Sequence, residues 1–172
     1  GCAGIGTSVS ATGLGAGPVI IAGSDEQKAT WLAPLIHEPI LCSFGLSEPG
    51  VGSDVASMKT SAVRDGDEYV INGSKTFITN AGYADWTVVF AKTDPKAGAK
   101  GMSAFVVPMD APGVTTEKHL DKMGQRSTDA SASAPQDVLT HPVHRPGGER
   151  GGVQTAMVDT DVRTPGTPPV SA

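Results

Sequence analysis

Residues 39–54 read Pro39-Ile40-Leu41-Cys42-Ser43-Phe44-Gly45-Leu46-Ser47-Glu48-Pro49-Gly50-Val51-Gly52-Ser53-Asp54. The part from 39 to 46 has the length and apolar content of a buried strand. Pro49 then removes a backbone donor, while Gly50 and Gly52 permit torsions that side chains forbid and let N–H groups approach a ligand closely. The sequence therefore predicts a strand that ends in a glycine-rich loop.

Two hydroxyl side chains, Ser47 and Ser53, bracket this loop, and each can donate and accept hydrogen bonds. A strand end with bare amides and two hydroxyls suits a polar, planar ligand. It suits an ordinary tight turn equally well. The loop matches no phosphate-binding pattern, so spacing alone favours the turn.

The composition is that of a chain near the size of one ordinary domain. Its 172 residues are enough to bury a core, and 22 Gly with 13 Pro predict abundant loops. The formal net charge of −5 argues against a nucleic-acid partner, because binding to phosphate backbones needs clustered Lys and Arg.

The sequence shows no basic leader before Lys28, and we expect neither a signal peptide nor an apolar run of membrane-spanning length. We therefore expect no membrane insertion. Cys2 and Cys42 are far apart and form no CxxC pair, which favours two free thiols in a reducing compartment.

The first part of the chain is expected to be helical. The glycines of residues 1–23 are interpreted as packing and bend positions, since no strand precedes them. Ser24-Asp25-Glu26-Gln27 is a capping-box sequence that predicts a helix over about 25–36. Pro34 is expected to shorten or kink this helix, and His37 to act as a partner of the helix dipole.

From residue 39 onward the pattern changes to short strands and turns. Candidate strands lie at 57–63, 68–71, 75–79, 86–91 and 102–107, with a turn at 64–67. Asn72-Gly73 is the strongest short hairpin signal in the chain. Short strands with turn signals at this spacing indicate an antiparallel barrel or sandwich.

The signal weakens after Asp129. Residues 130–135 stand where a closing strand is expected, and Pro135 should occur only at a sheet edge. Residues 146–152 predict a flexible loop and 153–158 could open a helix, which the prolines of the following residues cannot continue. We expect an irregular or disordered C-terminal tail.

Three segments resemble landmarks of the acyl-CoA dehydrogenase family. Residues 43–54 resemble its first signature, Ile71-Asn72-Gly73-Ser74-Lys75-Thr76-Phe77-Ile78-Thr79-Asn80 its second flavin-contacting segment, and Lys122-Met123-Gly124-Gln125-Arg126 a third landmark. Their order and spacing also fit. The resemblance runs from about Val19 to about Asp129, and a family member is usually more than twice the length of this chain.

The resemblance implies a fragment with three parts. Residues 1–38 would end an N-terminal helical domain, 39–140 would form a β-barrel that binds flavin and acyl-CoA, and 141–172 would be a linker and the truncated start of a C-terminal helical domain. The implied fold is an α+β fragment, mainly an antiparallel β-barrel preceded by a helical segment.

The activity implied by the resemblance is FAD-dependent α,β-dehydrogenation of acyl-CoA thioesters in fatty-acid or amino-acid catabolism, with electron-transferring flavoprotein as partner. A carboxylate base removes an α-proton and the β-hydride passes to N5 of FAD, so the protein supplies position and electrostatics. The location would be cytoplasmic, or the mitochondrial matrix in a eukaryote. A homo-oligomer is expected only of a full-length protein.

Site residues are carried over from the matching segments. Thr79 would hydrogen-bond near flavin N5, Phe77 would pack against the ring, and Ile78 would present its backbone. Ser47 would contact the pyrimidine edge, and Ser53 would reach the CoA part of the substrate. The remaining cofactor-binding positions are Phe44, Gly45, Leu46 and Gly52. The competing interpretation is that Phe77 and Ile78 merely alternate through a strand that Thr79 caps.

No catalytic residue is assigned, because the resemblance places the general-base Glu in a domain that this chain lacks. Glu48 is expected to satisfy loop amides rather than to form an acid–base pair with Asp54. The segment Asp159 to Thr164 resembles a CoA-nucleotide contact imperfectly. His141 and His144 have no third ligand nearby and lie in a proline-rich stretch, so no metal site is expected.

The chain alone is therefore expected to be inactive. Two alternatives stay open: a non-catalytic β-barrel binding module, and an acyl-CoA oxidase-type relative that passes electrons to oxygen.

Overall fold

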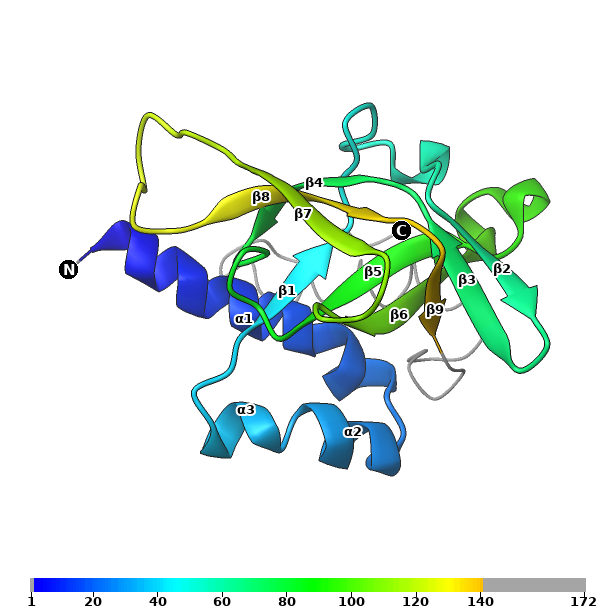
Figure 1. Ribbon diagram of the computed structural model, residues 1–172, viewed down its shortest axis with the longest axis horizontal. Helices are drawn as coiled ribbons and strands as arrows, with labels where there is room; N and C mark the ends of the chain where they lie inside the picture. The colour runs from blue at the N-terminus through cyan, green and yellow to red at the C-terminus, as the bar shows by residue number, and fades with distance from the viewer. Residues whose placement is uncertain (1, 141–172) are drawn as a thin grey trace, which may run out of the picture.

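The computed structural model describes residues 2–140, which form three helices followed by two β-sheets (Figure 1). The predictions for the C-terminal tail, for His141 and His144 and for Asp159 to Thr164 lie outside the described residues. The helices are α1 (Ala3–Ala22), α2 (Asp25–Trp31) and α3 (Pro34–His37), with 3₁₀ turns η1 (Val55–Ser57) and η2 (Pro95–Gly101). The strands are β1 (Cys42–Gly45), β2 (Ser61–Asp65), β3 (Glu68–Asn72), β4 (Lys75–Thr79), β5 (Trp86–Lys92), β6 (Met102–Pro108), β7 (Val114–His119), β8 (Ala130–Pro135) and β9 (Val138–Thr140).

Helix α1 lies against β1 with its small residues toward the sheet. A Cβ atom on Gly15 would lie 2.7 Å from the Ser43 carbonyl oxygen, so only glycine permits this close approach. Ala16 and Val19 continue the buried face. The expected packing role of the early glycines is thus realised within one long helix.

The helix predicted over 25–36 is two short helices. Ser24 and Gln27 form the expected reciprocal capping box, with Ser24 N–H donating to Gln27 Oε1 at 2.8 Å and Gln27 N–H to Ser24 Oγ at 3.2 Å. Helix α2 ends at Trp31, and Pro34 starts α3, where its missing N–H has no helical partner to lose. His37 lies in the last turn, as expected.

The larger sheet is mixed, whereas the smaller one is wholly antiparallel. The larger sheet has the order β1-β5-β2-β3-β9 with β6 paired to β5, and the smaller has the order β4-β8-β7. Strand β1 runs parallel to β5, with Phe44 opposite Val88. The prediction of a mainly antiparallel barrel is therefore corrected to a curled, half-barrel arrangement of two sheets.

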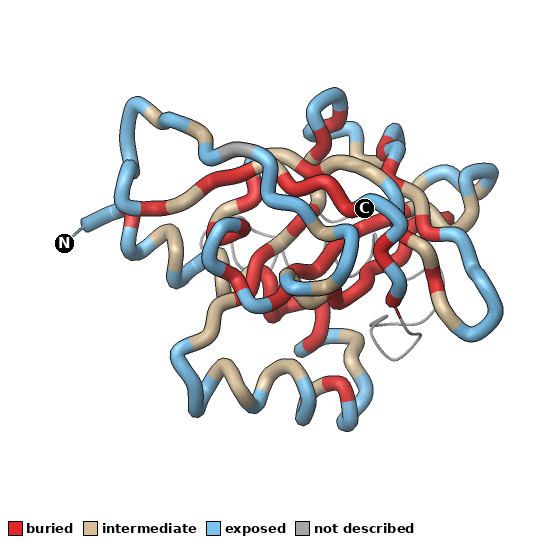
Figure 2. Tube along the Cα trace, viewed as in Figure 1, coloured by how far each residue is buried: buried red, intermediate tan, exposed pale blue. Residues whose placement is uncertain are grey.

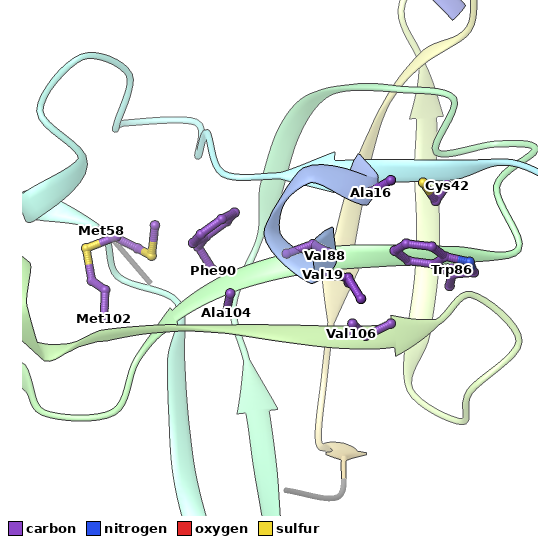
Figure 3. Close-up of a cluster of buried hydrophobic side chains, with 10 residues drawn as sticks. All are labelled: Ala16, Val19, Cys42, Met58, Trp86, Val88, Phe90, Met102, Ala104 and Val106. Carbon is purple, nitrogen blue, oxygen red and sulfur yellow. The ribbon is translucent and has the colours of Figure 1, made fainter. Parts of the chain in front are cut away.

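Strands β5 and β6 are buried on both faces, and they separate two apolar clusters (Figure 2). Side chains from α1, β1, β5 and β6 form the first cluster, which includes Val19, Trp86 and Phe90 (Figure 3). The second cluster lies on the other face, around Ile71 and Phe105. A strand covered on both faces reads as a continuous apolar run, which is why β5 was recognisable in the sequence.

Asn72-Gly73 does not close a hairpin, and this prediction is wrong. Strand β3 pairs with β2 and β9, whereas β4 pairs with β8 in the other sheet. The Asn72 side chain instead exchanges hydrogen bonds with Asp137, donating at 3.0 Å and accepting from its N–H at 2.9 Å. A Cβ atom on Gly73 would lie 2.3 Å from Thr60 Oγ1. Only glycine therefore fits at this point, where the chain passes from β3 in the larger sheet to β4 in the smaller sheet.

Pro135 also departs from expectation, because it belongs to β8, the central strand of the smaller sheet. It is the last residue of that strand, and its carbonyl oxygen accepts a hydrogen bond of 3.0 Å from Gly73 N–H. Two strand starts also shift: β1 begins at Cys42 rather than 39, and β2 at Ser61 rather than 57.

Helix α1 contradicts the expectation of no apolar run of membrane-spanning length. Its 20 residues have a mean hydropathy of 1.4, which by length and composition alone would allow it to cross a membrane. Residues 15–19 are nevertheless buried on the sheet, which is how a core helix of a globular domain packs.

Candidate functional site

A cleft of about 260 Å³ opens between α1, the end of β1 and β4. It is lined by Ala11, Leu14, Phe44, Leu46, Ser47, Thr76, Phe77 and Thr79. The walls are mostly apolar, and the polar groups are three hydroxyls at Ser47, Thr76 and Thr79. An apolar cleft with a few convergent polar groups is typical of a small-molecule site.

Two sets of hydrogen bonds join the walls of this cleft. The Thr76 N–H donates to the Ser47 carbonyl oxygen at 2.9 Å, which ties the residue after β1 to β4. At the far end of β4, Asn80 donates to the Ser8 carbonyl oxygen of α1 at 2.9 Å and accepts from Ser8 Oγ at 2.5 Å. The helix, the β1 end and β4 are therefore held together by bonds at both ends of the cleft.

A β-bulge in β4 shapes the wall that carries Phe77. Lys75 pairs with Ser133 and Ile78 with Ser131, so β4 has one residue more than β8 over this interval. Phe77 lies within the bulge and has a φ of 57°, a left-handed conformation that is strained for an aromatic residue. Its side chain is 72% exposed although it lines the cleft. Strain and exposure together at one aromatic ring are features of a functional position.

The structure brings most of the sequence-predicted site residues together. Phe44, Leu46, Ser47, Phe77 and Thr79 all line the cleft. Ile78 is not among the residues that line the cleft: it is buried and lines a small interior cavity instead. Gly45 is buried behind the wall, where a Cβ atom would lie 3.3 Å from the Val88 carbonyl oxygen.

Gly52 and Ser53 are not among the lining residues of the cleft. Both are exposed in the loop after β1. The Glu48 and Val51 backbones close that loop with hydrogen bonds of 2.9 and 3.0 Å.

Three lining residues were missed from the sequence: Ala11, Leu14 and Thr76. Thr76 lies inside the segment 71–80, which was recognised from its resemblance. Strict alternation of side chains along β4 would place Thr76 and Phe77 on opposite faces of the sheet, and the bulge brings both to the cleft. Ala11 and Leu14 belong to α1, whose register on the sheet no local pattern reveals.

Glu48 and Lys75 form a buried ion pair behind the cleft. Lys75 Nζ lies 3.0 Å from Glu48 Oε1, and the side chains are 5% exposed for Glu48 and 0% for Lys75. Glu48 also accepts from Lys59 N–H at 2.8 Å, from Thr60 N–H at 2.9 Å and from Thr60 Oγ1 at 2.5 Å. The expectation that Glu48 satisfies loop amides is confirmed.

Burial sets the protonation behaviour of this pair. Desolvation lowers the pKa of the Lys75 ammonium to about 8, and the Glu48 carboxylate opposes that shift. Burial raises the pKa of Glu48, but the hydrogen bonds from Thr60, Lys59 and Lys75 outweigh it and hold that pKa below its ordinary value. Asp54, the other acid of the loop, accepts from the Ser57 hydroxyl instead.

A Ser, His and Asp cluster lies at the other end of the smaller sheet. His119 Nδ1 lies 2.6 Å from Asp129 Oδ1 and 3.3 Å from Ser131 Oγ. Both partners approach the same ring nitrogen, so the serine is not activated through the far side of the imidazole as in a hydrolase triad. His119 is an exposed residue at the end of β7. Within residues 2–140, no group of three or more His, Cys, Asp or Glu could hold a metal ion.

Residues 43–138 match the family model for the middle domain of acyl-CoA dehydrogenases. The chain is 45% identical over 129 residues to the rat short-chain specific acyl-CoA dehydrogenase, mitochondrial, covering 74% of this chain and 31% of the relative. It is 40% identical over 149 residues to the Caffeyl-CoA reductase-Etf complex subunit CarC of Acetobacterium woodii, covering 87% of this chain and 39% of that protein.

Two solved structures share the fold. Butyryl-CoA dehydrogenase from Megasphaera elsdenii superposes with a TM-score of 0.90 at 38% identity, over 92% of this chain and 42% of that structure. A protein described as an FAD-dependent dehydrogenase gives a TM-score of 0.89 at 31% identity, over 92% of this chain and 43% of that one. The chain thus spans about two fifths or less of the length of these proteins.

Proposed function

The chain belongs to the acyl-CoA dehydrogenase family, and on that premise we propose that its cleft binds the isoalloxazine ring of FAD. The observation that carries the proposal is the meeting of Ser47, Thr79 and an exposed, strained Phe77 on one apolar cleft. One structural relative is named as an FAD-dependent dehydrogenase, which supports the same cofactor here.

The residues present fit a planar heterocycle with a polar edge. Phe77 would offer its ring as a wall against one face, and the apolar side chains of Phe44 and Leu46 would exclude water. The hydroxyls of Ser47 and Thr79 would donate hydrogen bonds to ring heteroatoms, and such donors favour electron density on the ring. Ile78 is buried outside the cleft lining, so we assign it no contact with the ring. When bound, the flavin would supply the redox chemistry by accepting a hydride from the substrate.

The substrate class that we propose is an acyl-CoA thioester, which undergoes α,β-dehydrogenation in the whole protein. Two relatives are named as dehydrogenases of acyl-CoA substrates. Ser53, in the exposed loop outside the cleft, would contact the CoA portion. Electron-transferring flavoprotein is the proposed partner, and the Acetobacterium woodii relative is named as a subunit of a complex with Etf.

We assign to residues 39–140 the role of a flavin-binding domain, which follows the helical segment of residues 1–38. The residues that line the cleft include no Asp or Glu, so the described part of the chain offers no carboxylate base beside the proposed ring. Proton abstraction would then depend on a base outside residues 2–140. We expect the 172-residue chain alone to show no turnover of acyl-CoA.

The absence of a carboxylate in the cleft lining of the described residues also favours a second candidate function, that of a non-catalytic module that retains flavin affinity. Assaying the 172-residue chain with FAD, butyryl-CoA and an artificial electron acceptor tests the lack of turnover that both candidate functions predict for this chain alone. Substantial turnover would contradict both the expected inactivity and the module. Peroxide formed in step with turnover would indicate an oxidase-type relative.

Flavin binding itself is tested by fluorescence anisotropy of FAD titrated with the chain. Thr79→Val should weaken binding roughly three- to tenfold, since one net hydrogen bond is lost. Thr115→Val is the matched control, because Thr115 lies on β7 and its hydroxyl donates to the Ala134 carbonyl oxygen. Equal affinities for the wild type and both variants would place the flavin elsewhere.

A further inference from the structure

The buried ion pair of Glu48 and Lys75 touches both walls of the cleft without lining it. Lys75 is the first residue of β4, directly before Thr76 and Phe77. Its ammonium donates to the Leu46 carbonyl oxygen at 3.1 Å and to Glu48 Oε1 at 3.0 Å. One charged group of β4 thus contacts the residues on both sides of Ser47, through the Leu46 backbone and the Glu48 side chain.

The pair is also anchored on the side away from the cleft. Glu48 accepts from the backbone of Lys59 and from the backbone and hydroxyl of Thr60, just before β2. The carboxylate therefore stays in place through three hydrogen bonds that do not involve Lys75. Glu48 therefore has a fixed position, and the hydrogen bond from Lys75 to Glu48 fixes the start of β4 relative to it.

Glu48 supplies the charge that acts on the ammonium. Lys75 is the one titratable residue among those lining the interior cavity that its stem enters. Lys59 contacts Glu48 through its backbone N–H, and the residue is exposed. Moving two charges out of water is expensive and is often no more stabilising than apolar packing. Because such a pair adds little to stability, we expect its role to be to fix the positions of the segments that it joins.

We propose that Glu48 and Lys75 form a brace that sets the spacing between the Ser47 wall and the Thr76–Thr79 wall, which makes Lys75 a positioning residue for the bound ring. This inference rests on the proposed function, because it assigns the brace to the flavin cleft. The brace acts through the Thr76-to-Ser47 hydrogen bond, whose two residues immediately follow Lys75 and Leu46. Without the ammonium, the walls would keep their fold but lose their fixed separation.

The first readout needs no flavin. Amide hydrogen exchange of Thr76 reports opening of the bond to Ser47, and it should be roughly tenfold faster in Lys75→Met and Glu48→Gln than in the wild type, after correction for global stability. Glu48→Gln keeps the shape of the side chain and serves if Lys75→Met does not fold. Val138→Ala is the control, since Val138 belongs to the second apolar cluster but lines neither the cleft nor the interior cavity beside Lys75.

The second readout is the affinity for FAD by anisotropy. Both brace variants should bind roughly tenfold more weakly than Val138→Ala, although neither side chain lines the cleft. In the double variant the two losses should not add, because either change alone removes the same brace.

The outcomes separate the two ideas. A wild-type chain that binds no FAD would overturn the proposed function, whatever the exchange data show. Thr76 exchange in both brace variants equal to that of Val138→Ala would overturn the brace, whether or not flavin binds. Fast Thr76 exchange with unchanged FAD affinity would overturn the positioning role of Lys75.

Discussion

The Thr76 N–H donates a hydrogen bond of 2.9 Å to the Ser47 carbonyl oxygen, and this bond joins two segments that the sequence separates by a helical turn and two strands. Each segment alone is an ordinary strand end or strand. Joined, they present hydroxyls from both segments toward one cleft, with Phe77 beside them. The cleft therefore depends on how β1 and β4 are brought together.

Phe77→Gly should stabilise the chain while weakening its flavin site. Phe77 holds a φ of 57° and is 72% exposed, so glycine relieves strain and loses little burial. We expect the free energy of unfolding in urea to rise by up to about 1 kcal/mol, and the FAD affinity to fall because the aromatic wall is gone. A less stable variant would show that the left-handed conformation carries no strain.

Two glycines of the same helix should respond oppositely to alanine. A Cβ atom on Gly15 would lie 2.7 Å from the Ser43 carbonyl oxygen, and this backbone atom cannot easily move. We expect Gly15→Ala to lower the free energy of unfolding by about 1–3 kcal/mol. A Cβ atom on Gly6 would meet no other described residue within 4 Å, so Gly6→Ala should raise the free energy of unfolding by up to about 1 kcal/mol. Equal effects at both sites would contradict the close packing of α1 on β1.

Thr87→Val should leave the fold as stable or make it more so. Within residues 2–140, the buried Thr87 hydroxyl has no hydrogen-bond partner. A valine of similar shape removes this unpaired polar group, with a gain in stability of up to about 1 kcal/mol. Thr60→Val is the matched comparison, because its buried hydroxyl donates to Glu48 and its loss should reduce stability by about 1.5–3 kcal/mol. Urea unfolding of both variants measures the contrast. Similar losses in the two would show that Thr87 Oγ1 has a partner.

The stability of the chain should rise with pH in the alkaline range because of Lys75. Its pKa is about 8 in the folded chain against an ordinary 10.5, so the unfolded chain binds more protons between these values. By linkage, the unfolding free energy should increase from about pH 8 toward 10.5, by at most about 3 kcal/mol.

The control for this pH dependence is Lys75→Met, which should lack the rise. Both chains are compared in a Cys2→Ser background, since the Ser127 hydrogen bond lowers the pKa of the Cys2 thiol and would add its own dependence. Parallel curves for the two chains between pH 8 and 10 would mean that Lys75 titrates normally.

The sequence predicted the elements whose structure depends on burial along one strand or on contacts between neighbouring residues. Strand β5 is covered on both faces, so its apolar run was unmistakable, and the capping box at Ser24 is a contact within four residues. The two segments that we propose to contact the flavin were identified from their resemblance to a family, and five of the residues named from it line the cleft.

What sequence reasoning missed depends on contacts between distant residues. Asn72-Gly73 carries a hairpin signal, but no hairpin forms and the chain passes to the other sheet. The Asn72 side chain hydrogen-bonds to Asp137, and Thr60 packs closely against Gly73. The bulge at Phe77 arises from the register of β4 on β8, which no local pattern records. The parallel pairing of β1 with β5 likewise depends on where α1 places β1.

The central claim is that the ring of the flavin lies between Ser47 and Thr79. The most direct measurement is a titration of the ¹⁵N-labelled chain with FAD, followed through backbone amide signals. We predict the largest shifts at Ser47, Thr76 and Thr79, with little change at Ser61 and Arg64, which line a separate groove beside β2. Shifts centred on that groove, or none in a folded chain at saturating FAD, would contradict the claim.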